Sequence, residues 1–285
     1  MNRIKFNRFK DYNFMVLGII STLIGLVLLA IFIGDILIEG IPRINWKFLT
    51  SLPSRIPARA GIFTAMMGSI WVLVMTALIA FPIGVAAGIY LEEYAKKSRM
   101  AKLLEINISN LAGVPSIIYG LLGLEIFARV MKMGSSVLAG SLTLALLILP
   151  IIIVATRESI KAVPQSIRDA SYALGASKWQ TIYHQVLPAS FGGVLTGVIL
   201  ALSRAVGEAA PLIVVGALAY VPFAPKSPMD EFSVLPIQIF NWISRPQHGF
   251  IINAAAAIII LLIITFGMNG IAMYLRSRWQ KKISW

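Results

Sequence analysis

Residues 60–91 read AGIFTAMMGSIWVLVMTALIAFPIGVAAGIYL and contain no Asp, Glu, Lys, Arg or His. A helix of this length rises about 48 Å, more than the roughly 30 Å of hydrocarbon in a bilayer. Further uncharged stretches also reach the roughly 17 to 25 residues that a spanning helix needs, namely residues 12–34, 106–124, 133–156, 185–203 and 249–275. The sequence therefore predicts an all-α, polytopic membrane protein with six transmembrane helices.

The composition agrees with this prediction. Hydrophobic residues make up 58% of the 285 residues and charged residues 13%, where about 25% charged is usual for soluble domains. A soluble enzyme, a disulfide scaffold and a nucleic-acid-binding domain are excluded, so the net charge of +13 indicates no nucleic-acid partner. The chain has no cysteine, which removes thiolate nucleophiles and thiolate metal ligands.

The basic residues are distributed unequally between the two sides of the six spans. One side carries sixteen, in both tails and in the second and fourth loops: Arg3, Lys5, Arg8, Lys10, Lys96, Lys97, Arg99, Lys102, Arg157, Lys161, Arg168, Lys178, Arg276, Arg278, Lys281 and Lys282. The other side carries eight: Arg43, Lys47, Arg55, Arg59, Arg129, Lys132, Lys226 and Arg245. Because cytoplasmic loops are enriched in Lys and Arg, we expect both termini in the cytoplasm. A seventh span at residues 209–221 would place the basic C-terminal tail outside, so we expect one long, broken fifth helix instead.

The fourth loop, RESIKAVPQSIRDASYALGASKWQTIYHQVLPAS at residues 157–190, is longer than a connector requires. Ser166 and Asp169 have the spacing of a capping box, which predicts a helix over residues 166–174 that Gly175 ends. A second amphipathic helix is predicted over residues 179–186, ending at Leu187 and Pro188. These helices either lie on the membrane surface or form a docking site for another protein.

The same loop resembles the cytoplasmic signature of ABC importer permeases, which forms the coupling helix that contacts the ATPase. The matching positions are Asp169, Ala170, Ser171, Gly175, Leu187 and Pro188. Three departures are visible, because the family commonly has Glu at 169, Ala at 171 and Ile at 185, where this chain has Gln185.

Three other motifs restrict the resemblance to one group of ABC importer permeases. Residues 110–120 (NLAGVPSIIYG), 203–211 (SRAVGEAAP) and 235–246 (LPIQIFNWISRP) resemble the A-type membrane subunits of phosphate-specific ABC transporters. The similarity covers roughly residues 60–279, with Ala209 where the family commonly has Thr. It implies the type I ABC importer permease fold and ATP-driven phosphate import across a bacterial cytoplasmic membrane.

The resemblance also implies an organisation and a set of partners. Residues 1–59 would hold the N-terminal tail, the first helix and an extracytoplasmic loop, residues 60–275 the five-helix permease core, and residues 276–285 a basic cytoplasmic tail. The partners would be membrane lipid, a second permease, two ATPase subunits that hold ATP and Mg²⁺, and an extracytoplasmic phosphate-binding protein. The chain itself is expected to bind no cofactor.

Arg204 and Glu208 are charged residues within the fifth predicted helix, four positions apart and therefore on one face. A charge at the bilayer centre costs about 2.5 to 3.5 kcal/mol, so we expect the two side chains to pair and face inward. The pair either fixes helix packing or, as the resemblance implies, lines the substrate pathway. These two interpretations stay open.

Glycine and proline predict two helix breaks, at Gly113 and Pro115 in the third span and at Gly207 and Pro211 in the fifth. Each break is either an ordinary kink or part of a pathway. His184 and His248 lack a second ligand at metal spacing, so we predict no metal site.

The chain has no Gly-x-x-x-x-Gly-Lys-Ser/Thr loop, so ATP hydrolysis would belong to a partner and the chain is not expected to be an enzyme. Two alternatives to phosphate import remain: an ABC permease for another oxyanion, and an ion-coupled secondary carrier.

Overall fold

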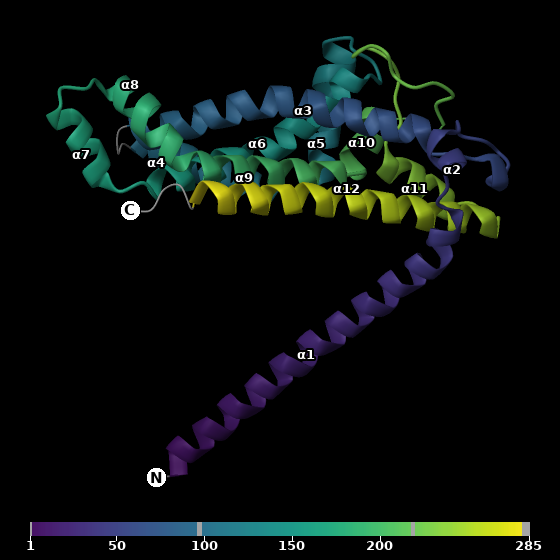
Figure 1. Ribbon diagram of the computed structural model, residues 1–285, viewed down its shortest axis with the longest axis horizontal. Coiled ribbons are helices and arrows are strands. Elements are labelled where there is room, and N and C mark those ends of the chain that lie inside the picture. Colours follow the sequence, from purple (N-terminus) through teal and green to yellow (C-terminus); the bar gives the residue numbers. More distant parts are fainter. Residues whose placement is uncertain (1, 96–98, 218–219, 281–285) are drawn as a thin grey trace.

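The computed structural model describes residues 2–95, 99–217 and 220–280, which are almost entirely helical (Figure 1). Its long helices are α1 (Asn2–Gly40), α3 (Phe63–Ile89), α6 (Val137–Lys161), α9 (Leu187–Val206) and α12 (His248–Gln280). Its shorter helices are α2 (Trp46–Thr50), α4 (Arg99–Leu111), α5 (Ser116–Gly123), α7 (Gln165–Ala173), α8 (Lys178–Thr181), α10 (Ala210–Val215) and α11 (Leu235–Ile243). Two 3-10 helices, η1 (Ile41–Arg43) and η2 (Pro57–Arg59), and three π-helical segments, η3 (Tyr90–Tyr94), η4 (Leu124–Val130) and η5 (Ile182–Val186), complete the described elements.

Among the described residues, five helices are long and apolar enough to cross a membrane: Lys10–Arg43, Phe63–Tyr94, Val137–Lys161, Lys178–Val206 and His248–Trp279. They match five of the six predicted spans. The remaining one, at residues 106–124, is divided between α4 and α5, and η4 then extends it. Since α5 alone has eight residues, this segment crosses as a broken helix and not as one continuous rise.

The core lies where α3, α6, α9 and α12 pack side by side. Small residues let these helices approach: a Cβ on Gly84 or Gly88 of α3 would come 2.6 or 2.7 Å from α6 side chains, and one on Gly197 of α9 would come 2.3 Å from the Ala155 Cβ. Close approach at small residues is the usual way that membrane helices associate. Gly84 and Gly88 therefore form a packing face of α3 against α6.

Helix α1 leaves the bundle near the start of α12 and extends away from it (Figure 1). Its contact is confined to its C-terminal part, where Ile36 is buried against Ala255 and Ile259 and Gly40 lies against the same region of α12. The most apolar 18-residue window of this span has no buried residue. The bundle therefore forms without most of α1, as expected for a helix added to a five-helix core.

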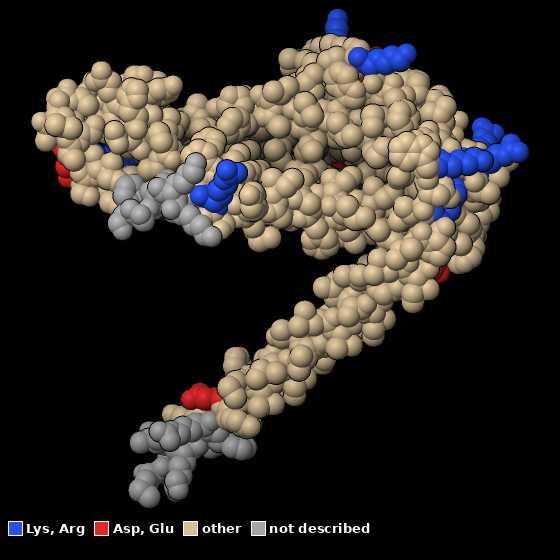
Figure 2. Space-filling view, viewed as in Figure 1, with Lys and Arg blue, Asp and Glu red and all other residues tan. Residues whose placement is uncertain are grey.

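The two ends of the bundle differ. One end, which we call the loop end, carries α7 and α8, and α1 begins and α12 ends toward this side (Figure 1). At the opposite end Arg43 binds the segment before α3 to α12: its Nε donates to Asn253 Oδ1 at 2.7 Å and its Nη2 donates to the carbonyls of Pro57, Ala58 and Ala60. On the face shown in Figure 2, Lys and Arg lie mainly near the two ends of the bundle and at the top of the view. The surface between these regions is mostly uncharged.

Part of the predicted basic side lies outside the described residues, namely Lys96, Lys97, Lys281 and Lys282. Of the basic tail at residues 276–285, the described part is the end of α12. The described part of residues 209–221 holds no seventh spanning helix, because α10 has six residues and is capped by Gly216, whose φ is 103°. The chain then returns over α3 and α6, where Leu235 N donates to Ser69 Oγ and Val137 N donates to the Asp230 carbonyl.

Candidate functional site

The first part of the site is a contact between two interrupted helices. Helices α5 and α10, each of which follows a break, lie side by side. A Cβ on Gly120 of α5 would come 2.7 Å from Pro211 Cα and 3.0 Å from Val214 Cβ of α10. Because the nearest atoms belong to backbone that cannot rotate away, the contact requires glycine at position 120.

The break before α5 lies where the sequence predicted it. Helix α4 ends at Leu111, the N–H groups of Gly113 and Val114 bond back to Asn110 and Leu111, and Pro115 is extended with ψ 133°. The Tyr119 hydroxyl donates to the Leu111 carbonyl at 2.8 Å and so closes the gap in the helical hydrogen bonds. The break is therefore a defined turn with its carbonyl satisfied.

The second predicted break is also confirmed. Helix α9 ends at Val206, and Gly207 and Glu208 form short turns by donating to the carbonyls of Arg204 and Ala205. Helix α10 begins at Ala210 with Pro211 in its first turn, where the missing N–H of proline costs no helical hydrogen bond.

Arg204 and Glu208 form the expected ion pair across this break. Arg204 Nε lies 3.5 Å from Glu208 Oε1. The Glu208 side chain is 19% exposed, whereas that of Arg204 is 49% exposed. The prediction that both side chains face inward thus holds for the Glu208 carboxylate, whereas the Arg204 guanidinium reaches the surface of the chain.

The second part of the site is the loop between α6 and α9. Helix α7 exposes Asp169 and Ala170, Ser171 Oγ lies 2.9 Å from Thr181 Oγ1 of α8, and the φ of Gly175, 81°, ends the helix as predicted. The Leu174 side chain is 89% exposed. With Ile167, Ala170 and residues of α8 and η5, Leu174 borders an open cleft of about 640 Å³, which offers an apolar and small-residue surface to another protein.

Two local predictions for this loop are wrong. Pro164 is the N-cap of α7 and no side chain caps it, while Asp169 accepts from Gln165; the capping box is instead formed by Ser177 and Gln180 at the start of α8. The second loop helix does not end at Leu187 and Pro188 either. Both residues continue into α9 after the π-helical turn η5, so residues 178–206 form one helix from the loop into the bundle.

Sequence reasoning missed how this loop is held to the rest of the chain. Arg168 of α7 pairs with Glu93 of η3, with Nη2 2.7 Å from Oε1 and side chains 10% and 7% exposed. The same guanidinium donates to the carbonyls of Val163 and Ile160 at 2.8 and 3.1 Å. Lys178 donates to the Glu93 carbonyl and lies over a neighbouring tyrosine ring of η3. A buried, fully bonded guanidinium therefore fixes α7 to the end of the second span.

A second ion-pair group lies beside it. Arg157, at the end of α6, pairs with Glu92 of η3 at 2.9 Å and with Glu105 of α4 at 2.6 Å. The hydrogen bond from Arg157 lowers the pKa of the exposed Glu105 carboxyl below its ordinary value. The sequence feature that could have predicted both ion-pair groups is the acidic pair Glu92 and Glu93, which lies on a side of the chain that is otherwise rich in basic residues.

The two parts of the site are well separated. Arg204 lies sixteen positions beyond Pro188 in the same continuous helix, which corresponds to about 24 Å along the axis. Within the part of the chain that the structure describes, no cluster of His, Cys, Asp or Glu could hold a metal ion.

The chain is similar to several known proteins. The family described as "Binding-protein-dependent transport system inner membrane component" matches residues 80–281. The phosphate transport system permease protein PstA of Haemophilus influenzae is 34% identical over 259 residues, which cover 90% of this chain and 91% of that protein. PstA 1 of Mycobacterium tuberculosis strain CDC 1551 / Oshkosh is 31% identical over 243 residues, 83% of this chain and 78% of that protein. The probable ABC transporter permease protein YqgI of Bacillus subtilis is 30% identical over 281 residues, 94% and 95% of the two chains.

Solved structures share the fold at lower identity. A chain of a bacterial alginate ABC transporter aligns with a TM-score of 0.66 and 12% identity over 94% of this chain and 93% of that chain. A chain of the inward-facing MetNI methionine ABC transporter aligns with a TM-score of 0.55 and 18% identity over 75% and 97%. The all-α, polytopic arrangement of a type I importer permease is thereby confirmed, with the third and the fifth of the six spans broken.

Proposed function

The chain belongs to the binding-protein-dependent transport system inner membrane components, and from that premise we propose that it is the membrane-spanning permease subunit of an ATP-driven phosphate importer. That it is a multi-pass permease of an ABC transporter follows from the family itself. The substrate, the partners and the orientation are the proposal.

Arg204 carries the argument for an anionic substrate. A guanidinium that is half exposed in the last turn of a spanning helix is costly to place against lipid, so it faces a polar path or a neighbouring subunit. Its planar donors suit the oxygens of phosphate. Glu208, 3.5 Å away, competes for the same donors and keeps the anion from binding too tightly to leave.

Phosphate is favoured over other oxyanions by the narrower motifs. Arg204, Glu208, Gly207 and Pro211 all belong to residues 203–211, one of the three motifs shared with phosphate-specific subunits. Relatives whose names describe phosphate transport are 31% and 34% identical over most of the chain.

Energy would enter at the loop end. Two ATPase subunits, which hold ATP and Mg²⁺, contact α7 and the cleft beside it through Asp169, Ala170, Ser171 and Gly175. Motion of α7 passes to the second span through the Arg168–Glu93 pair and to the fifth through the unbroken helix at residues 178–206. The breaks at Gly113–Pro115 and Gly207–Pro211 then let the outer part of the pathway open for phosphate released by an extracytoplasmic binding protein.

This mechanism sets the orientation in a bacterial cytoplasmic membrane. The loop end and both termini face the cytoplasm, where the larger number of basic residues lies. A second, homologous permease completes the pathway and receives the guanidinium side of Arg204.

The experiment is uptake of radiolabelled phosphate by proteoliposomes that hold this chain with its copurified partners. We expect uptake that requires ATP on the ATPase side and that excess sulfate leaves unchanged. Uptake without ATP would support an ion-coupled carrier, and inhibition by sulfate would assign the permease to another oxyanion.

A further inference from the structure

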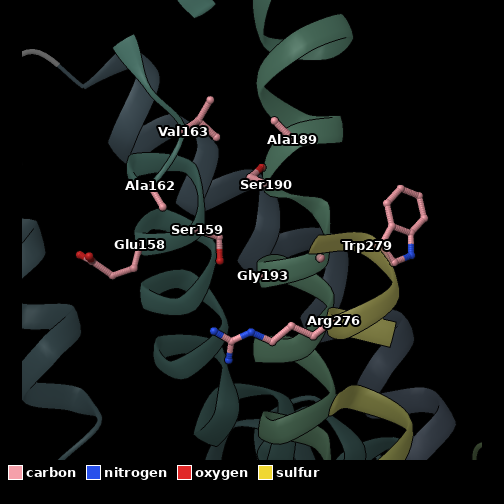
Figure 3. A pocket seen from close by; sticks show the side chains of 10 residues that line it. Glu158, Ser159, Ala162, Val163, Ala189, Ser190, Gly193, Arg276 and Trp279 are labelled. Atoms are coloured by element: carbon pink, nitrogen blue, oxygen red, sulfur yellow. The ribbon is translucent and has the colours of Figure 1, made fainter. Parts of the chain in front are cut away.

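A cleft of about 520 Å³ lies at the loop end, apart from both sites described above. It is bordered by the end of α6, the start of α9 and the end of α12 (Figure 3). These are three spanning helices, and the cleft lies next to the loop-end termini of α6 and α12. Neither the coupling surface nor the Arg204 region shares a residue with it.

One cation dominates this cleft. Arg276 extends from α12 across it toward Ser159 of α6, whereas the carboxylate of Glu158 points away from the cleft (Figure 3). Glu158 lies 3.8 Å from Lys161. Among the described residues Arg276 forms no ion pair. The guanidinium therefore supplies the charge that an incoming group would meet.

The other walls of the cleft offer hydroxyl oxygens and an aromatic ring, which suit a lipid headgroup. The Ser159 and Ser190 hydroxyls already donate to the carbonyls of Ala155 and Leu187, at 2.6 and 3.3 Å, so their oxygens are left as acceptors. On the α12 side, Trp279 packs on Phe191 with ring centroids 5.0 Å apart. Tryptophan is enriched at the level of lipid headgroups.

We propose that this cleft binds an anionic phospholipid of the phosphatidylglycerol type from the cytoplasmic leaflet. Arg276 binds the phosphate through charge-assisted hydrogen bonds, the glycerol hydroxyls donate to Ser159 and Ser190, and the first acyl carbons lie on the Trp279 wall. Basic pockets between spanning helices on this side of a membrane are known to hold lipid headgroups. The inference uses the proposed membrane orientation but not the proposed substrate.

The position and the walls favour lipid over free phosphate. The cleft lies at the ends of membrane-spanning helices, and its lining combines one cation with Ala162, Val163, Ala189 and the tryptophan ring. A free anion would gain nothing from this apolar part, whereas a phospholipid fills it.

The test is native mass spectrometry of the purified complex with phosphatidylglycerol or phosphatidylcholine added at equal concentration. We expect phosphatidylglycerol to be retained and phosphatidylcholine not. Arg276→Gln should lower retention by about tenfold, the usual size of a lost charge-assisted hydrogen bond, and Arg276→Lys by less. Arg278→Gln is the matched control, because Arg278 is exposed on the same helix and does not line the cleft.

Three results would overturn the proposal: equal retention by Arg276→Gln and Arg278→Gln, displacement of the lipid by inorganic phosphate, or loss of the second permease from the Arg276→Gln complex. The last would show that a subunit covers the cleft. An unchanged unfolding temperature of Arg276→Gln separates loss of the site from misfolding. Because transport is not measured, failure of the phosphate proposal would leave this test intact.

Discussion

Arg204 combines three properties: a full charge, a place in the last turn of a spanning helix just before a helix break, and a side chain that is half exposed. If its only role were to fix α9 against α10, burial of both partners would serve better. The exposed guanidinium beside a less exposed carboxylate is instead suited to exchanging one anionic partner for another.

Reversing this charge tests the pathway role. We expect Arg204→Glu to reduce phosphate uptake by at least tenfold, since a repelled anion loses a charge-assisted hydrogen bond as well. Copurification of the partner subunits should be unchanged. Uptake by the purified variant in proteoliposomes is the measurement, and normal phosphate uptake would reduce the pair to a packing role.

A second prediction at this scale concerns the buried pair of Arg168 and Glu93. Glu93→Gln leaves a buried guanidinium without its counter-charge, so we expect the free energy of unfolding to fall by about 3 kcal/mol. ATP hydrolysis by the complex should also become less effective in driving uptake. The ratio of phosphate imported to ATP hydrolysed measures this coupling.

The exposed pair of Arg129 and Glu125 is the control. Their side chains are 66% and 62% exposed, and such pairs contribute about 1 kcal/mol or less. Arg129→Gln should therefore change neither the unfolding temperature nor the coupling ratio appreciably. If Glu93→Gln behaved in the same way, the pair would not be the link between α7 and the second span.

At the scale of elements, the contact between α5 and α10 depends on one glycine. We expect Gly120→Ala to destabilise the chain by about 1 to 3 kcal/mol, because the new Cβ meets the backbone of Pro211 at 2.7 Å and forces the helices apart. A thermal unfolding series in detergent measures the loss.

Gly113→Ala provides the comparison within the same broken segment. Its Cβ would come no closer than 3.4 Å to Asn110 O, and its φ is not positive. A much smaller effect is therefore expected. Equal losses from the two substitutions would mean that backbone freedom, and not close packing, determines the role of glycine in this segment.

Both helix breaks could be predicted from sequence because their cause is local. Proline lacks a backbone donor and glycine relaxes the chain, so the close pairs Gly113 with Pro115 and Gly207 with Pro211 interrupt their helices, whereas the isolated Pro82 and Pro150 lie inside continuous helices. Pro188 was misread for a related reason. It lies in the first turn after the π-helical segment η5, whose wider turn accommodates a residue without an N–H, and the helix continues.

Other features are not local and could not be predicted. The spacing of a capping box occurs at both Ser166 and Ser177, but packing places Pro164 at the start of α7, and the box forms only at α8. Arg168 and Glu93 are 75 residues apart, so no spacing rule brings them together. The Arg276 cleft likewise needs the ends of three helices in one place.

At the scale of the whole molecule, the arrangement of the ends fixes a topology that can be tested directly. The chain has no cysteine, so single cysteines can be introduced without removing others. We expect Lys226→Cys to react with a membrane-impermeant maleimide in intact cells, and Arg278→Cys, which lies outside the ATPase contact proposed for α7, only after the membrane is opened. Both positions are exposed, so accessibility to the reagent differs only by side. The reverse labelling pattern would invert the orientation.

The unbroken helix at residues 178–206 also determines how far a small movement at the loop end is carried. At 1.5 Å per residue it is about 43 Å long, so a swing of about 5° at α8 displaces the Arg204 end by nearly 4 Å if the helix pivots near its start. This displacement is larger than a hydrogen-bond distance of about 3 Å. Under the proposed function, this helix would act as a stiff lever, in which a slight rotation by the ATPase gives a displacement large enough to open or shut a passage for a single anion.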